Sequence, residues 1–198
     1  MTARAGGKRV NIYLDGKFGF GIDLENFVKL GLKVEQVLSE DEVKSIIQKS
    51  DSQKISDKII NFATLRPRSE KEVELWLLRK KVGENYHKGL WDKLKRLELV
   101  DDEKFAKWWI EQRLEFRFKS KRELEQELRI KGIKREVIDQ VLGESDLDDE
   151  KMARNLLAQK AYKWKGLPNE KARQKMSEFL GRKGFNWEII KKVTGEQE

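Results

Sequence analysis

Residues 131–141 read KGIKREVIDQV, and residues 183–193 read KGFNWEIIKKV. Each stretch starts with a Lys-Gly pair and continues with apolar residues at helical spacing, at its positions 3, 7, 8 and 11. The offset between the two stretches is 52 residues at every one of these positions. Two matching stretches at one fixed offset indicate an internal repeat, and a period of this length is typical of stacked helical units.

The similarity extends upstream of both stretches and into a third copy. In the second copy, Leu124 and Leu128 correspond to Met176 and Leu180 of the third at the same offset. A fainter copy lies 51 residues earlier, with Ser69, Val73, Leu77 and Lys80 in the places of Ser120, Leu124, Leu128 and Lys131. The sequence therefore predicts three repeats of about three helices each, stacked around a continuous but thin core.

A pair of aspartates opens the second and the third copy. Asp101-Asp102 recurs as Asp148-Asp149 after 47 residues, whereas the rest of the copy recurs after 52. The difference predicts a five-residue insertion in the third copy, near residues 163–166.

Short helices account for most of the chain from about residue 52 onward. Breaks that contain glycine or proline separate these helices; they lie at Arg66-Pro67, Val82-Gly83, Lys131-Gly132, Gly143, Gly166–Pro168 and Lys183-Gly184. We expect a mainly α fold of three tandem three-helix repeats with a small N-terminal β-hairpin and helix module. The expected modules are residues 1–50, 51–100, 101–145 and 146–198.

Residues 8–22, KRVNIYLDGKFGFGI, alternate apolar and polar residues on both sides of an Asp-Gly turn signal, as a β-hairpin does. A two-residue turn would pair Leu14 with Lys17 and place the two apolar rows on opposite faces. A three-residue connection would pair Leu14 with Phe18 and place both rows on one face. We favour the longer connection because one side of a small hairpin must be buried. Further on, residues 39–42 form a capping box that opens a helix.

The bulk composition limits the class of protein. Hydrophobic residues make up 38% of the 198 residues and charged residues 39%, which favours an elongated shape with thin local cores. The absence of cysteine excludes disulfides and thiolate metal sites, and the single histidine excludes a polyhistidine zinc site. No apolar run reaches the length of a membrane span, and the N-terminus has no signal-peptide core. We expect a cytoplasmic protein.

Basic residues are concentrated in the second half of the chain. Residues 151–192 contain twelve Lys/Arg and three Glu, a net charge of +9, while the whole chain has +8. Residues 113–135 have a net charge of +5, and the acidic segment 144–150 separates the two stretches. Clustered positive charge of this kind is typical of a phosphate-binding surface, although solvated helix faces would also produce it.

Two groups of aromatic residues lie among these bases. Phe116 and Phe118 lie in the first basic stretch, and Tyr162 and Trp164 in the second. Such residues either stack on unpaired nucleobases or pack between repeats. Most other aromatics, among them Trp76, Trp91, Phe105 and Trp108, lie at apolar helix positions and are expected in the core.

Several segments resemble the RecX family of bacterial recombination regulators over nearly the whole chain. The segments are Arg66–Glu70 with Glu72, Leu99–Asp102 with Phe105-Ala106, Glu127-Leu128 with Lys131–Ile133, and, in an N-terminal extension, Val10–Asp15 with Gly31–Val34. The third repeat departs from the usual pattern by the insertion around Trp164 and by Met152 in the place of an aromatic residue.

The resemblance implies three three-helix repeats in a curved array that binds the RecA–DNA filament. It implies inhibition or tuning of strand exchange and of ATP hydrolysis by RecA, some affinity for single- and double-stranded DNA, and roles in DNA repair, homologous recombination and the SOS response. It implies no catalytic residue and no cofactor, and we expect a monomer. The expected contacts with DNA or RecA are Arg66, Arg68, Arg113, Arg117, Lys119, Lys121, Arg122, Lys131, Lys160, Lys163, Lys165, Arg182 and Lys183.

Alternative interpretations remain for single residues and for the whole chain. The aspartate pairs are metal ligands or, far more commonly at such positions, helix caps. His87 suits a surface or capping role better than catalysis, because no nucleophile is near it in the sequence. Arg66 and Arg68 bind a phosphate or an acidic surface, or pair with Glu70 and Glu72. The whole chain is alternatively a stand-alone architectural or helix-turn-helix DNA-binding protein, or a scaffold for protein partners.

Overall fold

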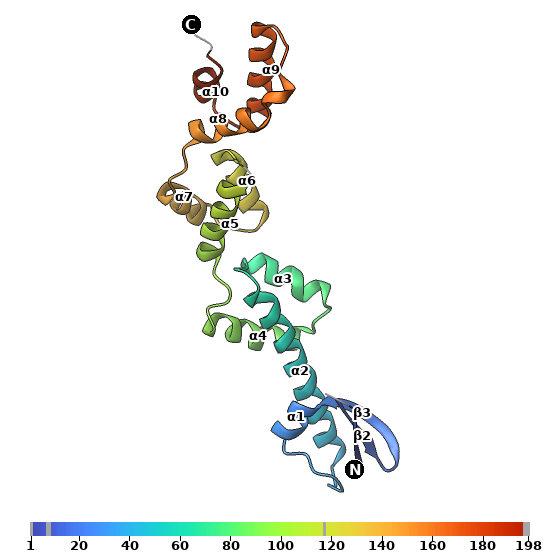
Figure 1. Ribbon diagram of the computed structural model, residues 1–198. Coiled ribbons are helices and arrows are strands. Elements are labelled where there is room, and N and C mark those ends of the chain that lie inside the picture. Colours follow the sequence, from blue (N-terminus) through green and yellow to red (C-terminus); the bar gives the residue numbers. More distant parts are fainter. Residues whose placement is uncertain (1, 7–8, 117, 196–198) are drawn as a thin grey trace. The chain divides into compact units, whose positions relative to one another are not determined.

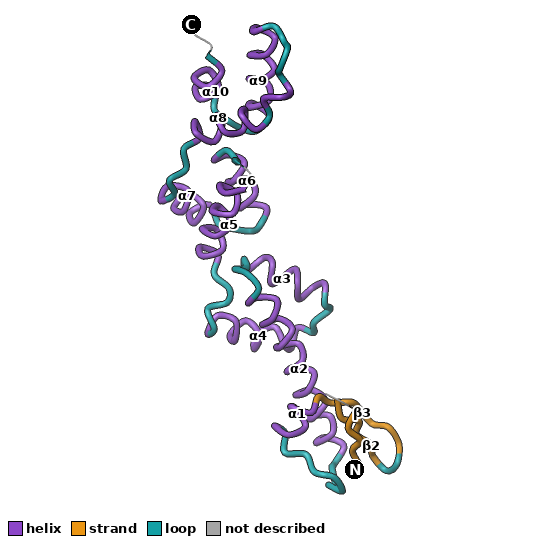
Figure 2. Tube along the Cα trace, viewed as in Figure 1, coloured by secondary structure: helices purple, strands orange, loops and turns teal. Residues whose placement is uncertain are grey.

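The computed structural model describes residues 2–6, 9–116 and 118–195. The described chain is mainly helical, and its strands all precede residue 24 (Figures 1 and 2). It forms two compact units, Met1–Leu65 with Val82–Leu94 and Arg66–Lys81 with Lys95–Glu198. None of the described helices is long and apolar enough to cross a membrane.

The first unit contains an antiparallel sheet and three helices. The sheet has the strand order β1-β2-β3. Its strands are β1 (Thr2–Gly6), β2 (Arg9–Leu14) and β3 (Lys17–Asp23), and its helices are α1 (Leu24–Lys29), α2 (Glu40–Thr64) and α4 (Glu84–Arg96), of which residues 84–94 belong to this unit. Strand β1 was not predicted, because TARAG contains none of the large apolar residues whose alternation identified the two strands of the hairpin.

The turn between β2 and β3 has two residues, so the longer connection that we favoured is wrong. Leu14 lies opposite Lys17, and the turn residues Asp15 and Gly16 have φ angles of 48° and 79°. Asp-Gly suits such a turn, because both central residues must adopt positive φ.

A β-bulge in β3 puts Phe20 and Ile22 on the same face as Val10 and Ile12, while Phe18 stays exposed. Tyr13 lies opposite Phe18, but Ile12 lies opposite Phe20, so that Gly19 is an extra residue in β3. The extra residue shifts the alternation by one position. One face of the hairpin is buried, as we expected, but the bulge and not a longer turn brings the apolar residues to that face.

The core of the first unit joins the sheet to helix α2. Its buried residues are Val10, Ile12, Ile22, Leu32 and Ile46. The expected capping box is confirmed: the Ser39 hydroxyl accepts the Glu42 amide hydrogen, and the Glu42 carboxylate accepts the Ser39 amide hydrogen. Helix α2 then continues without a break through residue 50, where we expected a module boundary. Helix α4 is attached to α2 by a 2.7 Å hydrogen bond from Lys93 to the Ser56 hydroxyl.

The second unit contains helix α3 and two complete three-helix groups. Helix α3 comprises Glu70–Arg79. The second repeat consists of α5 (Asp102–Phe116), α6 (Lys121–Ile130) and α7 (Arg135–Glu144), and the third of α8 (Asp149–Gln159), the 3-10 turn η1 (Ala161–Lys163), α9 (Asn169–Arg182) and α10 (Trp187–Thr194).

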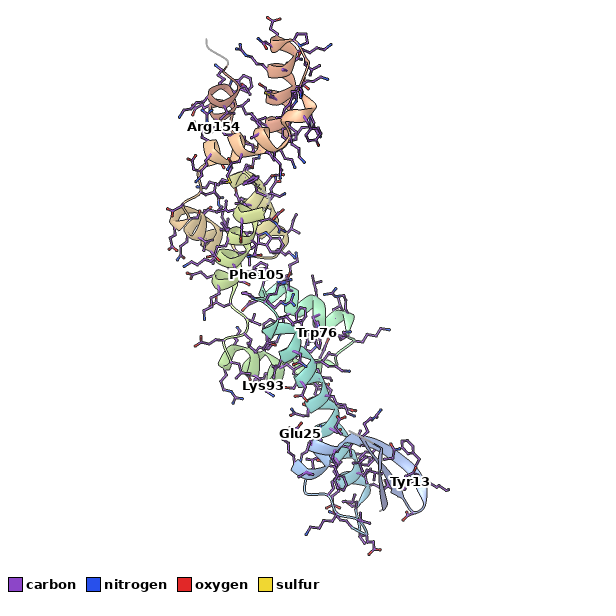
Figure 3. All side chains as sticks on the ribbon, viewed as in Figure 1. Tyr13, Glu25, Trp76, Lys93, Phe105 and Arg154 are labelled. Atoms are coloured by element: carbon purple, nitrogen blue, oxygen red, sulfur yellow. The ribbon has the colours of Figure 1, made fainter. Side chains whose placement is uncertain are left out.

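Each of these two repeats has its own core. The core of the second repeat includes Leu124, Leu128 and the fully buried Phe105, which Figure 3 labels on α5. Trp108 and Trp109 are half-buried against this core. The core of the third repeat contains Met152, Ala153, Leu156, Leu180, Phe185 and Ile190. The residues that repeat in the sequence are thus the core residues of successive helical groups.

The aromatic residues among the bases have different environments. Trp164, from the expected insertion, is buried and packs edge-on against Phe179 with 5.6 Å between ring centroids. Phe118 is half-buried against the core of the third repeat. Tyr162 is 68% exposed. Packing therefore accounts for Trp164 and Phe118, and an exposed stacking surface remains only at Tyr162; the side chain of Phe116 is outside the described part of the structure.

Candidate nucleic-acid interface

Successive repeats are joined by hydrogen bonds to helix ends. At the first junction, the Ser69 hydroxyl accepts the Glu72 amide hydrogen at 3.2 Å and donates to the Lys131 carbonyl at 2.9 Å. The Asp102 carboxylate accepts the amide hydrogen of Glu70 at 2.8 Å. One serine and one aspartate therefore cap the start of α3 and attach it to the second repeat.

The second junction repeats this arrangement between α6 and the third repeat. The Ser120 hydroxyl accepts the Glu123 amide hydrogen at 3.2 Å and donates to the Lys183 carbonyl at 2.6 Å. The Asp149 carboxylate accepts the amide hydrogen of Lys121 at 3.0 Å. The internal repeat of the sequence therefore encodes the contacts between repeats as well as the repeats themselves.

Each aspartate pair caps the N-termini of two different helices. Asp101 and Asp148 cap their own helices, accepting amide hydrogens of Lys104 at 2.9 Å and of Lys151 at 3.1 Å. Their neighbours cap a helix of the preceding repeat, as described above. Capping accounts for both pairs, and no group of three or more potential metal ligands is found in residues 2–6, 9–116 and 118–195.

Gly132 and Gly184 allow the repeats to approach closely. Both have positive φ, 87° and 79°. A Cβ atom at Gly132 would lie 2.6 Å from the Cβ of Lys71, and one at Gly184 would lie 3.2 Å from the Ser120 hydroxyl oxygen. The Lys-Gly pair recurs because its glycine adopts a left-handed conformation against the preceding repeat.

Three of the expected DNA-binding cations surround Glu72 at the first junction. Arg66 donates two hydrogen bonds to its carboxylate at 2.8 and 3.1 Å, and the Lys131 ammonium donates one at 2.8 Å. The Arg68 guanidinium lies 3.8 Å from the same carboxylate. Burial alone would raise the pKa of Glu72, but the hydrogen bonds from Arg66 and Lys131 outweigh it and lower that pKa.

A second cluster forms around Glu127 within the second repeat. Its carboxylate accepts hydrogen bonds of 2.8 Å from both the Trp109 indole and the Arg113 guanidinium, and Lys119 lies 3.0 Å away. Arg113 also lies 4.0 Å from the centre of the Trp109 ring. Burial alone would raise the pKa of Glu127, but hydrogen bonds from Arg113, Lys119 and Trp109 outweigh it and lower that pKa. Arg113 and Lys119 therefore also have structural roles.

The second junction has a weaker ionic cluster. The Glu123 carboxylate lies 3.5 Å from the Lys119 ammonium and 3.6 Å from the Lys183 ammonium. With Lys183, six of the expected contact residues take part in ion pairs, of which Lys131–Glu72 and Lys183–Glu123 connect successive repeats.

The other expected contact residues extend into solvent. Within the described part of the chain no ion pair is found for six of them, and all but the half-buried Lys160 are exposed: Lys121, Arg122, Lys160, Lys163, Lys165 and Arg182. Arg117 lies outside the described residues. The structure thus divides the expected cations into a group bound by carboxylates and a group available to a ligand.

Helix α9 adds exposed cations that the sequence analysis did not select. Lys171, Arg173 and Lys175 are all exposed on this helix. The repeat offset could have found Lys175, because the equivalent position in each preceding repeat is a glutamate.

His87 has a local structural contact. Its Nε2 atom lies 3.0 Å from the Val82 carbonyl oxygen, just before helix α4, and the side chain is half-buried. This contact favours the surface or capping role over a catalytic one.

Comparison with known proteins agrees with this arrangement of repeats. The second and third three-helix domains of RecX match residues 101–142 and 148–194, and the N-terminal domain of regulatory protein RecX matches residues 6–39. Regulatory protein RecX of Clostridioides difficile strain 630 is 33% identical over 189 residues, which cover 95% of this chain and 89% of that protein. The chain belongs to the RecX family.

Other RecX proteins are similarly related. Regulatory protein RecX of Bacillus licheniformis is 31% identical over 192 residues, which cover 96% of this chain and 73% of that protein. A crystal structure of regulatory protein RecX aligns with a TM-score of 0.70 at 23% identity and covers 98% of this chain and 97% of that one. That of RecX from Lactobacillus salivarius has a TM-score of 0.63 at 23% identity, over 74% of this chain and 96% of that one. These two likenesses show that the RecX fold is shared.

Proposed function

We propose that this RecX family member regulates the RecA recombinase by binding the RecA–DNA filament. Its binding would inhibit or tune strand exchange and ATP hydrolysis by RecA, without a catalytic residue or cofactor of its own. Membership of the RecX family carries this proposal, since the related proteins are named regulatory proteins. The action would take place in the cytoplasm, during DNA repair by recombination and the SOS response.

We also propose sequence-tolerant contact with single- and double-stranded DNA by the free cations. Lys160, Lys163 and Lys165 lie close together in the sequence around the 3-10 turn, next to the exposed ring of Tyr162. Cations beside an exposed aromatic ring suit phosphates and an unstacked base. The modules at 1–50, 51–100, 101–145 and 146–198, acting together in one monomer, remain part of this proposal.

The test measures ATP hydrolysis by RecA on single-stranded DNA with increasing amounts of this protein. We expect the rate to change as the protein approaches the amount of RecA, and a stoichiometric excess without effect would overturn the proposal. The triple variant K160Q/K163Q/K165Q should need a higher concentration for the same effect. The control K58Q/K88Q/R96Q removes three exposed cations from other helices and should act like the wild type.

A further inference from the structure

The middle helices of the three repeats differ in charge. Helix α3 has two Lys/Arg and three Glu, α6 has three of each, and α9 has four Lys/Arg and two Glu. The net charge therefore rises from −1 through 0 to +2 along the repeats. The three helices occupy the same place in the repeat, since Leu77, Leu128 and Leu180 are equivalent core residues.

The substitutions that raise the charge include positions through which the first two repeats contact the following repeat. The serines that accept a following repeat, Ser69 and Ser120, correspond to Ala172 in the third. The junction carboxylates Glu72 and Glu123 correspond to Lys175. Helix α9 therefore has neither the hydroxyl nor the carboxylate with which α3 and α6 hold the lysine of a following repeat.

Helix α9 also begins earlier than its counterparts. It has 14 residues, whereas α3 and α6 have 10 each. The extra turn carries Lys171, which lies one helical turn before Lys175. With 3.6 residues per turn, Lys171, Lys175 and Arg182 lie within about 40° of one another around the helix axis.

These three side chains form a basic face, which we call the terminal face. All three are exposed, and none has an ion pair with any residue that the structure describes. Glu178 lies near the same side of α9 and accepts a 3.2 Å hydrogen bond from the Gln174 amide. At a rise of about 1.5 Å per residue, the face extends over roughly 16 Å along the helix.

A polar end to a stack of repeats would be needed for solubility alone. Solubility does not require one sign of charge, and asparagine, glutamine or a mixture of charges would serve equally well. The replacement of an acceptor glutamate by lysine, with two further cations on the same side, selects instead for an anionic partner. A span of roughly 16 Å corresponds to about five phosphates along one strand of duplex DNA, spaced by about 3.4 Å.

We infer that the terminal face of α9, Lys171, Lys175 and Arg182, binds the phosphate backbone of DNA. This inference rests on the DNA contact within the proposed function, but not on RecA. It assigns DNA contact to Lys171 and Lys175 in addition to Arg182. In this arrangement the surface that joins repeats elsewhere in the molecule is converted, in the third repeat, into a ligand surface.

The experiment measures binding of a fluorescent duplex oligonucleotide by anisotropy, without RecA and over a range of salt concentrations. Three lost phosphate contacts should lower the magnitude of the slope of log K against log salt by about 2.7, or roughly 500-fold in affinity near 0.1 M salt. We expect this loss in K171Q/K175Q/R182Q. The variant K58Q/K88Q/R96Q has the same net charge and should bind like the wild type, and the charge-retaining K171R/K175R/R182K should also retain binding.

Three results would overturn the inference. The first is unchanged binding by K171Q/K175Q/R182Q, and the second is a wild type that does not bind DNA. The third is an equal loss in both glutamine variants, which would indicate general charge attraction. The RecA assay distinguishes this inference from the proposed regulation. If the protein alters ATP hydrolysis by RecA but K171Q/K175Q/R182Q binds DNA like the wild type, only this inference is contradicted. If the terminal face binds DNA in a salt-dependent manner but the protein has no effect on RecA, only the proposed regulation is contradicted.

Discussion

The two repeat junctions share their hydrogen bonds but differ in their ionic contacts. Ser69 and Ser120 make equivalent bonds to the Lys131 and Lys183 carbonyls. In contrast, the nearest cation atoms lie 2.8 Å from the buried Glu72 and at least 3.5 Å from the more exposed Glu123. The difference teaches that backbone capping defines the repeat, whereas ion pairs are adjusted from one junction to the next.

The largest difference between the junctions is expected from alanine at their glycines. In Gly132→Ala, the new methyl group would meet the Lys71 side chain at its base, 2.6 Å from Cβ, in a residue with a φ of 87°. Backbone strain and overpacking together should lower the free energy of unfolding by about 3 kcal/mol. Gly184→Ala meets its first atom at 3.2 Å, which a shift of a few tenths of an ångström relieves, so backbone strain dominates and the loss should be about 1 kcal/mol.

Urea denaturation of the two glycine variants measures both losses. Gly143→Ala is a suitable control, because a Cβ atom at this position in α7 has open space and the helix favours alanine. An equal loss in G132A and G184A would contradict a tighter approach at the first junction.

The next largest difference is expected from removing the junction carboxylates. Glu72→Gln leaves the cations of Arg66 and Lys131 without their buried carboxylate, and should lower the free energy of unfolding by about 2 kcal/mol at neutral pH. Glu123→Gln breaks longer pairs and should cost no more than about 0.5 kcal/mol. Urea denaturation at pH 7 compares the two, and equal losses would show that the shorter contacts do not strengthen the first junction.

The pH dependence of the free energy of unfolding tests whether the ionised carboxylate of Glu72 stabilises the fold. The pKa of Glu72 is lowered in the folded protein, so the folded state holds this proton more weakly than the unfolded state. Its contribution to stability is present above the ordinary pKa of 4.5 and is lost as pH falls through the lower, folded pKa. In acid, Glu72→Gln and the wild type should therefore have the same free energy of unfolding. A difference in stability that persists in acid would indicate lost packing instead.

Much of the fold follows from local signals in the sequence. The Lys-Gly pairs and the hydrophobic periodicity placed the helices of the second and third repeats, because each signal acts within one or two helical turns. Strand β1 and the bulge at Gly19 were missed, since pairing with a distant strand determines both.

The candidate site was only partly predictable for a related reason. Net charge in a window counts Lys131 as a free cation, although it binds Glu72, and the Lys131–Glu72 pair joins residues 59 positions apart. Sequence charge therefore finds the right region, but it cannot separate cations that hold repeats together from cations that face solvent.

The smallest effect is expected from Asp102→Asn, because the pKa of Asp102 is raised chiefly by burial. A raised pKa gives stability that is present below the ordinary value of 3.8 and is lost as pH rises through the folded pKa, so the ionised carboxylate costs stability at neutral pH. Asp102→Asn keeps an oxygen that can accept the Glu70 amide hydrogen and removes the buried charge. At pH 7 its free energy of unfolding should equal that of the wild type or exceed it by a few tenths of a kcal/mol.

Asp102→Ala is the contrasting variant, because it removes the acceptor as well and should cost about 1 kcal/mol through the lost cap. Asp149 has the same position at the second junction, and burial raises its pKa too, so Asp149→Asn and Asp149→Ala should reproduce both results. Urea denaturation at pH 7 and at low pH measures all four. If asparagine were as damaging as alanine at either junction, the charge of the aspartate, and not its hydrogen-bond acceptor, would be what joins the repeats.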